Sequence, residues 1–558
     1  MNNLTIRGNL VNCFEQKIYP VEMIVSSGRI SSITRLIPEQ QYADLPFITP
    51  GFIDSHIHIE SSMLVPVEFA RLAVVHGTVA TVSDPHEIAN VCGIAGVEFM
   101  LENAKQSPFK FYFGAPSCVP ATIFETAGAT LDASAVEQLL DREEIKYLSE
   151  MMNFPGTLQG DSEVLKKIEA ARQRKKPVDG HAPGLRGEDA KKYISRGIST
   201  DHECVTAEEA ADKLACGMKI IIREGSAAKN FDALIELLAG HPDAIMFCSD
   251  DKHPDSLVEG HINQLCTRAV AKGIEVFNVL KAACINPVLH YNLEVGLLRE
   301  GDAADFIVLK DLKNFEVIET WIDGFRVAEK GKTLLPQVRI PDAIVNNFHC
   351  SKKELSDFHF PVLPGESKYP FQVIEAINGQ LITGKTDAQP LNENGYWVSD
   401  IENDVLKIVV VNRYFEAGVA KAFIRNFGLN NGALASSVAH DSHNIVAVGT
   451  SDAAITEAVN MVIASEGGIS CITENIQMVL PLPVAGLVSF DDGYRVAELY
   501  TLIDKAAKTA GSTLEAPFMT LSFMALLVIP HLKLSDLGLF DGDSFNVIDP
   551  VGNDRGTE

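Results

Sequence analysis

Between residues 51 and 295, eight short apolar stretches alternate with amphipathic, helix-forming stretches, and this alternation constrains the fold more than any other feature. Apolar runs of strand length followed by helices are typical of parallel βα units. Eight such units within about 200 residues predict an α/β fold in which a (β/α)8, TIM-like barrel closes. A doubly wound open sheet is the alternative, but no GxGxxG motif opens a helix here. The expected strands are 51–58, 77–85, 110–117, 145–153, 177–183, 197–203, 218–226 and 244–250.

The sequence on either side of the barrel predicts further domains, because 558 residues exceed one ordinary domain. Residues 1–50 and 296–345 both have short strand patterns separated by turns, so we expect one small composite β-domain. The catalytic barrel, residues 51–295, would be inserted into it. A charged, proline-containing stretch, residues 346–369, is expected to be a linker. Residues 370–558 mix strand and helix patterns and predict a C-terminal α+β domain.

Composition and charge exclude several classes of partner. The formal net charge of −27 repels a phosphate backbone, so we expect no nucleic-acid partner. The N-terminus lacks the pattern of a secretory signal, and no apolar run reaches the length of a membrane span. The ten cysteines are scattered without a CxxC pair, as is typical of free thiols in a reducing cytosol. We therefore expect a cytoplasmic protein that acts on a small molecule and has no membrane partner.

Ionisable residues gather at the carboxyl ends of the expected strands, where parallel barrels hold their reactive groups. His56 and His58 are two residues apart, so they project from the same face of one strand end. Singly, such residues are often hydrogen-bonded histidines or helix-capping carboxylates. Together, four imidazoles and two carboxylates suit one or two divalent ions of the Zn, Fe or Mn type. The candidate ligands are His56, His58, Glu150, His181, His202 and Asp250.

The chain resembles the amidohydrolase superfamily. The matching features are PGFIDSHIHIESS (50–62), the candidate ligands His181, His202 and Asp250, and the closing segment GLLREGDAADFIVLK (296–310). Within that superfamily, longer segments resemble the bacterial adenine deaminase family, over nearly the whole chain. These segments are TVSDPHEIANVCG (81–93), SEMMNFPG (149–156), DGHAPG (179–184), TDHE (200–203), REGSAAKN (223–230), FCSDDKHP (247–254) and LASSVAHDSHNIVAVG (434–449).

The resemblance implies a purine-salvage reaction in which adenine is hydrolysed to hypoxanthine and ammonia, by attack of a metal-activated hydroxide on purine C6. It implies two divalent ions, with manganese expected first and iron or zinc as alternatives. The six candidate ligands would hold them. Glu150 would be the bridge, because related two-metal hydrolases carry a carboxylated lysine there and residues 149–156 contain no lysine. A homo-oligomer, expected to be a dimer, is also implied.

Catalytic roles carried over from the resemblance fall on Asp250, His202 and Glu150. Asp250 would take the proton of the hydroxide and deliver it to the departing ammonia. Protonation of the purine ring needs a second acid, for which His202, Glu203 and Asp251 are all candidates.

Polar residues after the second and seventh strands are candidates for substrate contacts, because a purine edge requires both donors and acceptors. Loop hydrogen bonds and helix caps explain these residues equally well. The candidates are Ser83, Asp84, His86, Glu87, Arg223, Glu224 and Ser226. In the C-terminal part, His440, Asp441 and His443 resemble half of a second metal site, but we expect a structural or lid role for this loop.

Other functions fit less well. A cyclic-amide hydrolase of the dihydroorotase or hydantoinase kind usually needs a lysine at the end of strand four, and residues 149–156 contain none. The deaminases that combine H-x-E with PCxxC are excluded because no PCxxC occurs, and no GxSxG motif indicates a serine hydrolase. A metal-storing or ligand-sensing protein with a decayed barrel would have lost ligands, and none is lost.

Overall fold

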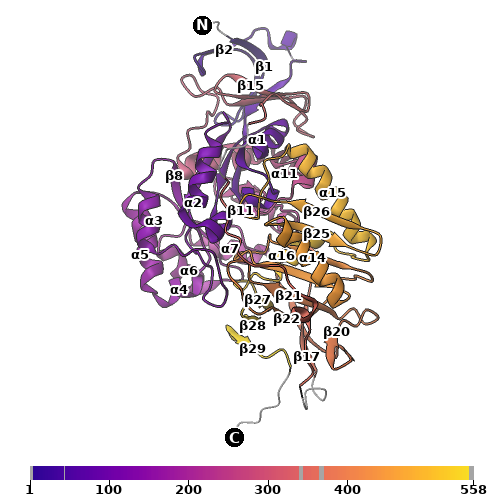
Figure 1. The fold of residues 1–558 in the computed structure, drawn as a ribbon. Helices are drawn as coiled ribbons and strands as arrows, with labels where there is room; N and C mark the ends of the chain where they lie inside the picture. The colour runs from indigo at the N-terminus through magenta and orange to yellow at the C-terminus, as the bar shows by residue number, and fades with distance from the viewer. Residues whose placement is uncertain (1–3, 43, 339–343, 364–369, 552–558) are drawn as a thin grey trace.

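The computed structural model describes residues 4–42, 44–338, 344–363 and 370–551. At its centre, eight parallel strands follow one another in sequence order, five in one sheet and three in a second (Figure 1). Nearly every residue of these strands is buried, which explains why they appear as continuous apolar runs. The strands are β5 (Phe52–Ile57), β6 (Thr78–Ser83), β7 (Lys110–Ala115), β8 (Ile145–Met151), β9 (Val178–Gly180), β10 (Thr200–Asp201), β11 (Lys219–Arg223) and β12 (Ile245–Cys248).

Backbone hydrogen bonds join the two sheets at both of their edges. Between β9 and β10, the amide of Ser199 donates to the carbonyl of Val178 at 2.9 Å. At the other edge, Ile57 of β5 pairs in parallel with Asp250, directly after β12. The amide of Asp250 there donates to the carbonyl of His56 at 3.0 Å. The ring is therefore closed, and the predicted (β/α)8 barrel is confirmed.

Helices connect the barrel strands and cover the outside of the ring (Figure 1). Local sequence starts several of them: the side chain of Asp161 accepts hydrogen bonds from the Glu163 and Val164 amides at the first turn of α5. The helices are α1 (Pro66–Ala73), α2 (His86–Ala104), α3 (Ala133–Leu140), α4 (Phe154–Gln159), α5 (Ser162–Gln173), α6 (Gly187–Ser195), α7 (Ala207–Ala215), α8 (Phe231–Leu234), α9 (Leu237–Gly240), α10 (Pro254–Glu259), α11 (Ile262–Ala271), α12 (Val276–Leu280) and α13 (Asn286–Tyr291).

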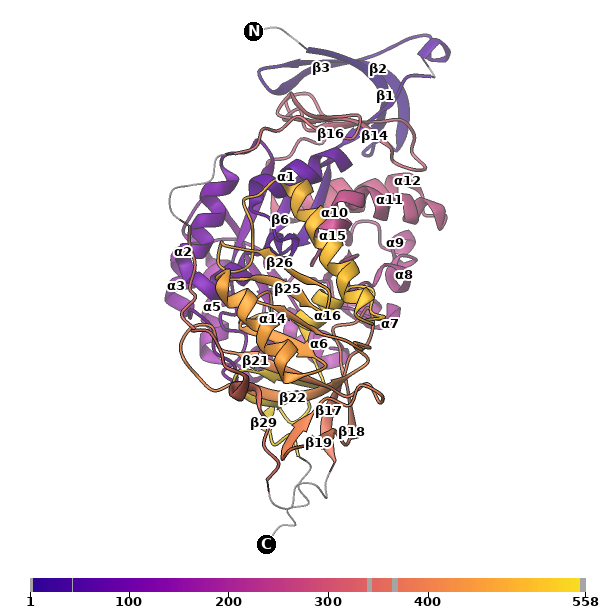
Figure 2. The same ribbon diagram turned by 45° about the vertical axis from the view of Figure 1, so that its right-hand side comes forward.

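Strands from before and after the barrel share one eight-stranded sheet, at the top of Figure 2. Its order is β16-β15-β14-β13-β4-β1-β2-β3, so β4 pairs with β1 on one side and with β13 on the other. The strands are β1 (Leu4–Asn12), β2 (Lys17–Ser26), β3 (Arg29–Arg35), β4 (Phe47–Pro50), β13 (Phe306–Leu309), β14 (Val317–Ile322), β15 (Phe325–Glu329) and β16 (Lys332–Thr333). We propose this sheet as the composite β-domain, of which residues 1–3, 43 and 339–343 lie outside the described residues.

The C-terminal part is built on a second eight-stranded sheet, of order β18-β17-β22-β21-β24-β23-β25-β26. Helix α14 contacts β23, β24 and β25 of this sheet, and α15 contacts β25, β26 and the barrel helix α10. We propose residues 370–558 as one α+β domain; residues 364–369 of the expected linker and 552–558 lie outside the described residues. Its elements are β17 (Phe371–Glu375), β18 (Gly384–Ala388), β19 (Leu391–Glu393), β20 (Tyr396–Val398), β21 (Leu406–Val411), β22 (Ala420–Arg425), β23 (Ala433–Ser436), β24 (Ile445–Gly449), α14 (Asp452–Ala464), β25 (Gly468–Ile472), β26 (Gln477–Pro481), α15 (Gly493–Thr509), α16 (Pro517–Phe523), β27 (Leu532–Ser535), β28 (Gly538–Asp541) and β29 (Asn546–Ile548).

Across the described ranges, no helix combines the length and the apolar character that crossing a membrane requires.

Candidate metal centre

The structure brings all six candidate metal ligands together at the carboxyl end of the barrel, and each of them is buried. His56 and His58 leave the end of β5 with their Nε2 atoms 3.2 Å apart. The Oδ1 atom of Asp250 lies 3.5 Å from Nε2 of His56 and 3.3 Å from Nε2 of His58. These three side chains form a compact group of two imidazoles and one carboxylate.

Glu150, in β8, lies between this group and the two remaining histidines. Its Oε1 atom is 3.3 Å from Nε2 of His58. Its Oε2 atom is 2.7 Å from Nδ1 of His181 and 3.2 Å from Nε2 of His202. Each carboxylate oxygen therefore faces a different set of histidines, which is the arrangement that a carboxylate bridging two cations requires.

The donor set fits divalent cations. Metal–ligand bonds of about 2.0–2.2 Å place neighbouring donors roughly 3–3.5 Å apart, as they are here. Nδ1 of His58 donates to the carbonyl of Asp84 at 3.2 Å, which leaves the Nε2 lone pair for a cation. Burial favours neutral carboxyls, but His181, His202 and His58 hold the pKa of Glu150 well below its usual range. These histidines therefore favour the ionised form of Glu150.

Contacts other than those with His56 and His58 also hold Asp250 in its orientation. Its backbone has a φ of 55°, a conformation that is uncommon for residues other than glycine and often marks a functional position. Its Oδ2 atom accepts a hydrogen bond from Nη1 of Arg223 at 2.7 Å, and Arg223 also binds both oxygens of Glu203. Burial opposes ionisation, but His56, His58 and Arg223 hold the pKa of Asp250 well below its usual range. Oδ2 therefore has a fixed partner, whereas Oδ1 faces the donor group.

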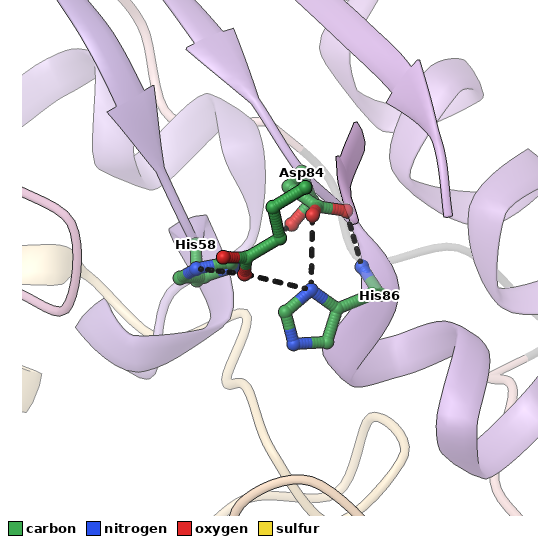
Figure 3. A group of neighbouring side chains, drawn as sticks. His58, Asp84 and His86 are labelled. Carbon is green, nitrogen blue, oxygen red and sulfur yellow. Dashed lines mark hydrogen bonds and ion pairs between the residues drawn. The ribbon is translucent and has the colours of Figure 1, made fainter. Parts of the chain in front are cut away.

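Asp84 and His86 lie against the same centre at the end of β6. Figure 3 shows the His86 ring beside the Asp84 carboxylate, with His58 opposite. Oδ2 of Asp84 is 3.0 Å from Nδ1 of His86, and Oδ1 accepts from the His86 amide at 3.1 Å. The His86 ring is also 3.6 Å from Oε1 of Glu150. His86 is thus placed to contact a molecule bound beside Glu150.

The structure places only some of the other predicted substrate-contact residues near the candidate metal ligands. Glu87 lines the cavity and Arg223 binds Asp250, but three others have partners elsewhere. The hydroxyl of Ser83 is 2.8 Å from that of Thr81. Glu224 pairs with Arg268 at 2.5 Å, and the hydroxyl of Ser226 accepts from the His253 amide at 2.9 Å. Ser83, Glu224 and Ser226 do not line the cavity that contains the ligands.

Side chains from the C-terminal part complete the lining of this cavity. Its volume is about 20 Å³, enough for a water molecule, so a purine would bind here only after side chains that line the cavity move. A larger cavity of about 590 Å³ shares Met152 with it. The C-terminal residues that line the small cavity are Leu381, His440, Asp441, Phe523 and Leu526. Local sequence patterns gave no signal for Leu381, Phe523 and Leu526, whereas the loop 440–443 lay in a segment that resembles the family.

Beneath the centre, Lys213 of α7 supports two ligand-bearing strand ends. Its buried ammonium donates to the carbonyl of Ala182 at 2.8 Å, to Asp201 at 3.0 Å and to Glu209 at 2.8 Å. Burial would lower the pKa of Lys213, but Asp201 and Glu209 raise it above its usual value. Ala182 and Asp201 directly adjoin the candidate ligands His181 and His202.

We expect Lys213→Met to destabilise the fold by about 3–5 kcal/mol, because two buried carboxylates would lose their cation. The thermal unfolding midpoint checks this. The control is Lys191→Met, at a side chain that is 67% exposed on α6. If the two variants unfold at the same temperature, the buried ammonium does not stabilise this region.

Two family models match the chain. The model described as Amidohydrolase family matches residues 47–327, and the model described as Adenine deaminase C-terminal domain matches residues 380–546. A protein named adenine deaminase from Salinibacter ruber is 54% identical over 551 residues, covering 98% of this chain and 99% of the relative. The chain belongs to the adenine deaminases of the amidohydrolase family.

Two further members of the adenine deaminase family agree. The protein of that name from Sulfurovum sp. is 54% identical and covers 98% of this chain and 99% of its own. The adenine deaminase from Methanosarcina acetivorans is 51% identical, and the match covers 97% of this chain and 98% of that protein. The resemblance that the strand-end motifs indicated is thereby confirmed over nearly the full length.

Proposed function

We propose that this protein hydrolyses adenine to hypoxanthine and ammonia. Full-length similarity to proteins named adenine deaminase supports the substrate. The observation that carries the chemistry is the convergence of six buried donor side chains around Glu150. A cyclic-amide hydrolase is disfavoured because β8 presents a glutamate and no lysine in SEMMNFPG.

We propose that the centre holds two divalent cations, manganese first, with iron or zinc as alternatives. His56, His58 and Asp250 would hold one ion, and His181 with His202 the other, with Glu150 between them. Bound there, the ions would lower the pKa of a water molecule and so provide a nucleophile for purine C6 at neutral pH.

Asp250 is proposed as the group that moves protons. Its Oδ1 atom faces the donor group, while Arg223 fixes Oδ2. The water oxygen forms a bond to C6 and the C6–amine bond breaks. Asp250 takes one proton from the water and gives it to the amine nitrogen, which leaves as ammonia, and the second water proton replaces the one that the ring-protonating acid gives to the purine.

Asp251 is the best placed of the three candidates for the acid that protonates the ring. Glu203 is held by both nitrogens of the Arg223 fork, and Nε2 of His202 faces Glu150. Asp251 lines the cavity and accepts a hydrogen bond from the hydroxyl of Ser61 at 2.5 Å. The serine after the His56-x-His58 motif would thus orient the second acid.

A substrate panel tests the proposal. We expect ammonia release from adenine to exceed release from cytosine and guanine, and turnover of dihydroorotate, by at least about a thousandfold. Such ratios are expected because a site that binds polar substrate groups rejects molecules lacking them by roughly 10⁴–10⁵. Metal content is measured on the same preparation. No ammonia from adenine with two equivalents of manganese bound would exclude the proposed function.

We further propose a cytoplasmic homodimer. The cysteines of the described residues are free thiols, as expected in a reducing compartment. Light scattering of the purified protein measures its mass, and a monomer at micromolar concentration would contradict the dimer.

A further inference from the structure

We propose that Asp441, from the C-terminal part, binds the substrate by accepting a hydrogen bond from the imidazole-ring N–H of adenine. This inference rests on the proposed function and adds a specificity-determining residue to it. Asp441 lies about 150 residues beyond the barrel (residues 51–295) in the sequence, yet its side chain lines the cavity that contains Glu150 and Asp250.

The carboxylate of Asp441 has an unused acceptor. Its side chain is only 3% exposed, and Oδ1 lies 3.7 Å from Nε2 of His86. Oδ2 is fully buried and has no hydrogen-bond partner among the described residues. A buried carboxylate oxygen without a donor is costly, so a donor from a bound molecule is expected at this position.

The chemistry of adenine identifies that donor. Neutral adenine carries two kinds of N–H: the exocyclic amine and one N–H of the imidazole ring. The amine is the leaving group, which the mechanism assigns to Asp250. The imidazole N–H therefore remains to be bound by a second acceptor, and a carboxylate makes the stronger, charge-assisted hydrogen bond with it.

The flanking histidines hold Asp441 in place over the barrel. Nδ1 of His440 lies 2.5 Å from Oε1 of Glu87, and Nε2 of His443 contacts Oε2 of the same carboxylate. Glu87 belongs to α2, directly after β6. Burial would raise the pKa of Glu87, but His440, His86 and His443 hold it well below its usual range. The ionised Glu87 thus anchors both sides of Asp441 to the barrel.

The turn that carries Asp441 is also closed internally. The amide of His443 donates to the carbonyl of Ala439 at 2.7 Å. The amide of Ala439 donates to Nδ1 of His443 at 3.1 Å. The carbonyl of Ser442 accepts from the Tyr414 hydroxyl at 2.5 Å. Asp441 is therefore a preorganised side chain, as a substrate-binding residue needs to be.

The test compares adenine with 9-methyladenine, which lacks an imidazole N–H. We expect Asp441→Ala to lower kcat/KM for adenine by about 10- to 100-fold, mostly through KM, because one hydrogen bond to a charged acceptor is lost. For 9-methyladenine the same substitution should change kcat/KM less than about threefold. Asp441→Asn, which keeps one carbonyl acceptor, should fall between.

Three controls accompany the comparison. Asp491→Asn replaces an exposed aspartate of the same C-terminal part. Metal content and the thermal midpoint are measured for each variant, and both should match the wild type. If wild-type turnover of 9-methyladenine is too slow to measure, inhibition of adenine turnover by hypoxanthine and by 9-methylhypoxanthine supplies the same comparison.

Several outcomes would overturn the proposal. Equal losses on the two substrates would mean that Asp441 only supports the fold. A loss of bound metal in Asp441→Asn would make it a metal ligand. If the wild type releases ammonia from adenine but Asp441→Ala lowers kcat/KM for neither substrate, this inference is wrong and the proposed function stands. A wild type without adenine turnover fails the proposed function and this inference with it.

Discussion

Asp250→Asn is expected to lower kcat/KM for adenine by about a thousandfold or more while both metal ions stay bound. General acid–base catalysis contributes roughly 10²–10⁴ in rate, and Asp250 is the proposed carrier of the transferred proton. Asparagine keeps one oxygen for the metal, but it loses the second acceptor that Arg223 uses and cannot accept that proton. Steady-state ammonia release and metal analysis of the same sample measure the two quantities.

The control for this variant is Asp189→Asn, which replaces an exposed aspartate in the first turn of α6. It should leave both quantities unchanged. If Asp250→Asn retains near wild-type turnover with its metal bound, the proton-carrying role of Asp250 is wrong.

Glu150→Gln is expected to remove at least one equivalent of metal and to lower kcat/KM by about a thousandfold or more. The two carboxylate oxygens face different histidines, at 3.3 Å from His58 and at 2.7 Å from His181. A glutamine amide is neutral and presents only one acceptor, so it cannot bind two cations. Metal content per chain and ammonia release after growth in manganese-supplemented medium test this.

Glu169→Gln is the matched control, because that glutamate lies on the exposed face of α5. Its metal content and activity should equal those of the wild type. Two equivalents of metal in Glu150→Gln would show that Glu150 does not bridge the ions.

The barrel could be predicted from sequence because parallel strands buried on both faces are continuous apolar runs. Each of the eight predicted strands contains one of the strands β5–β12. The split into two sheets could not be predicted, because β9 and β10 are only 3 and 2 residues long. The pairing of β4 with β13 also joins segments some 250 residues apart, which no local pattern encodes.

The expected strand ends predicted where the candidate ligands lie. They did not predict which way the side chains of the following loops point. Arg223 faces Asp250, so the alternation of strand side chains turns Glu224 outward, toward Arg268. That alternation was a usable signal for Glu224. Leu381, Phe523 and Leu526 reach the cavity only because a separate domain docks on the barrel, and sequence periodicity does not describe docking.

The small, covered cavity has a consequence for how the protein matures. A part of the chain that is synthesised after all six candidate ligands supplies side chains that line their cavity. We therefore expect ions to be captured most easily before the C-terminal part docks, and later exchange to require the two parts to separate transiently. The metal supplied during growth, more than the metal added to the purified protein, should then decide which metal form is obtained.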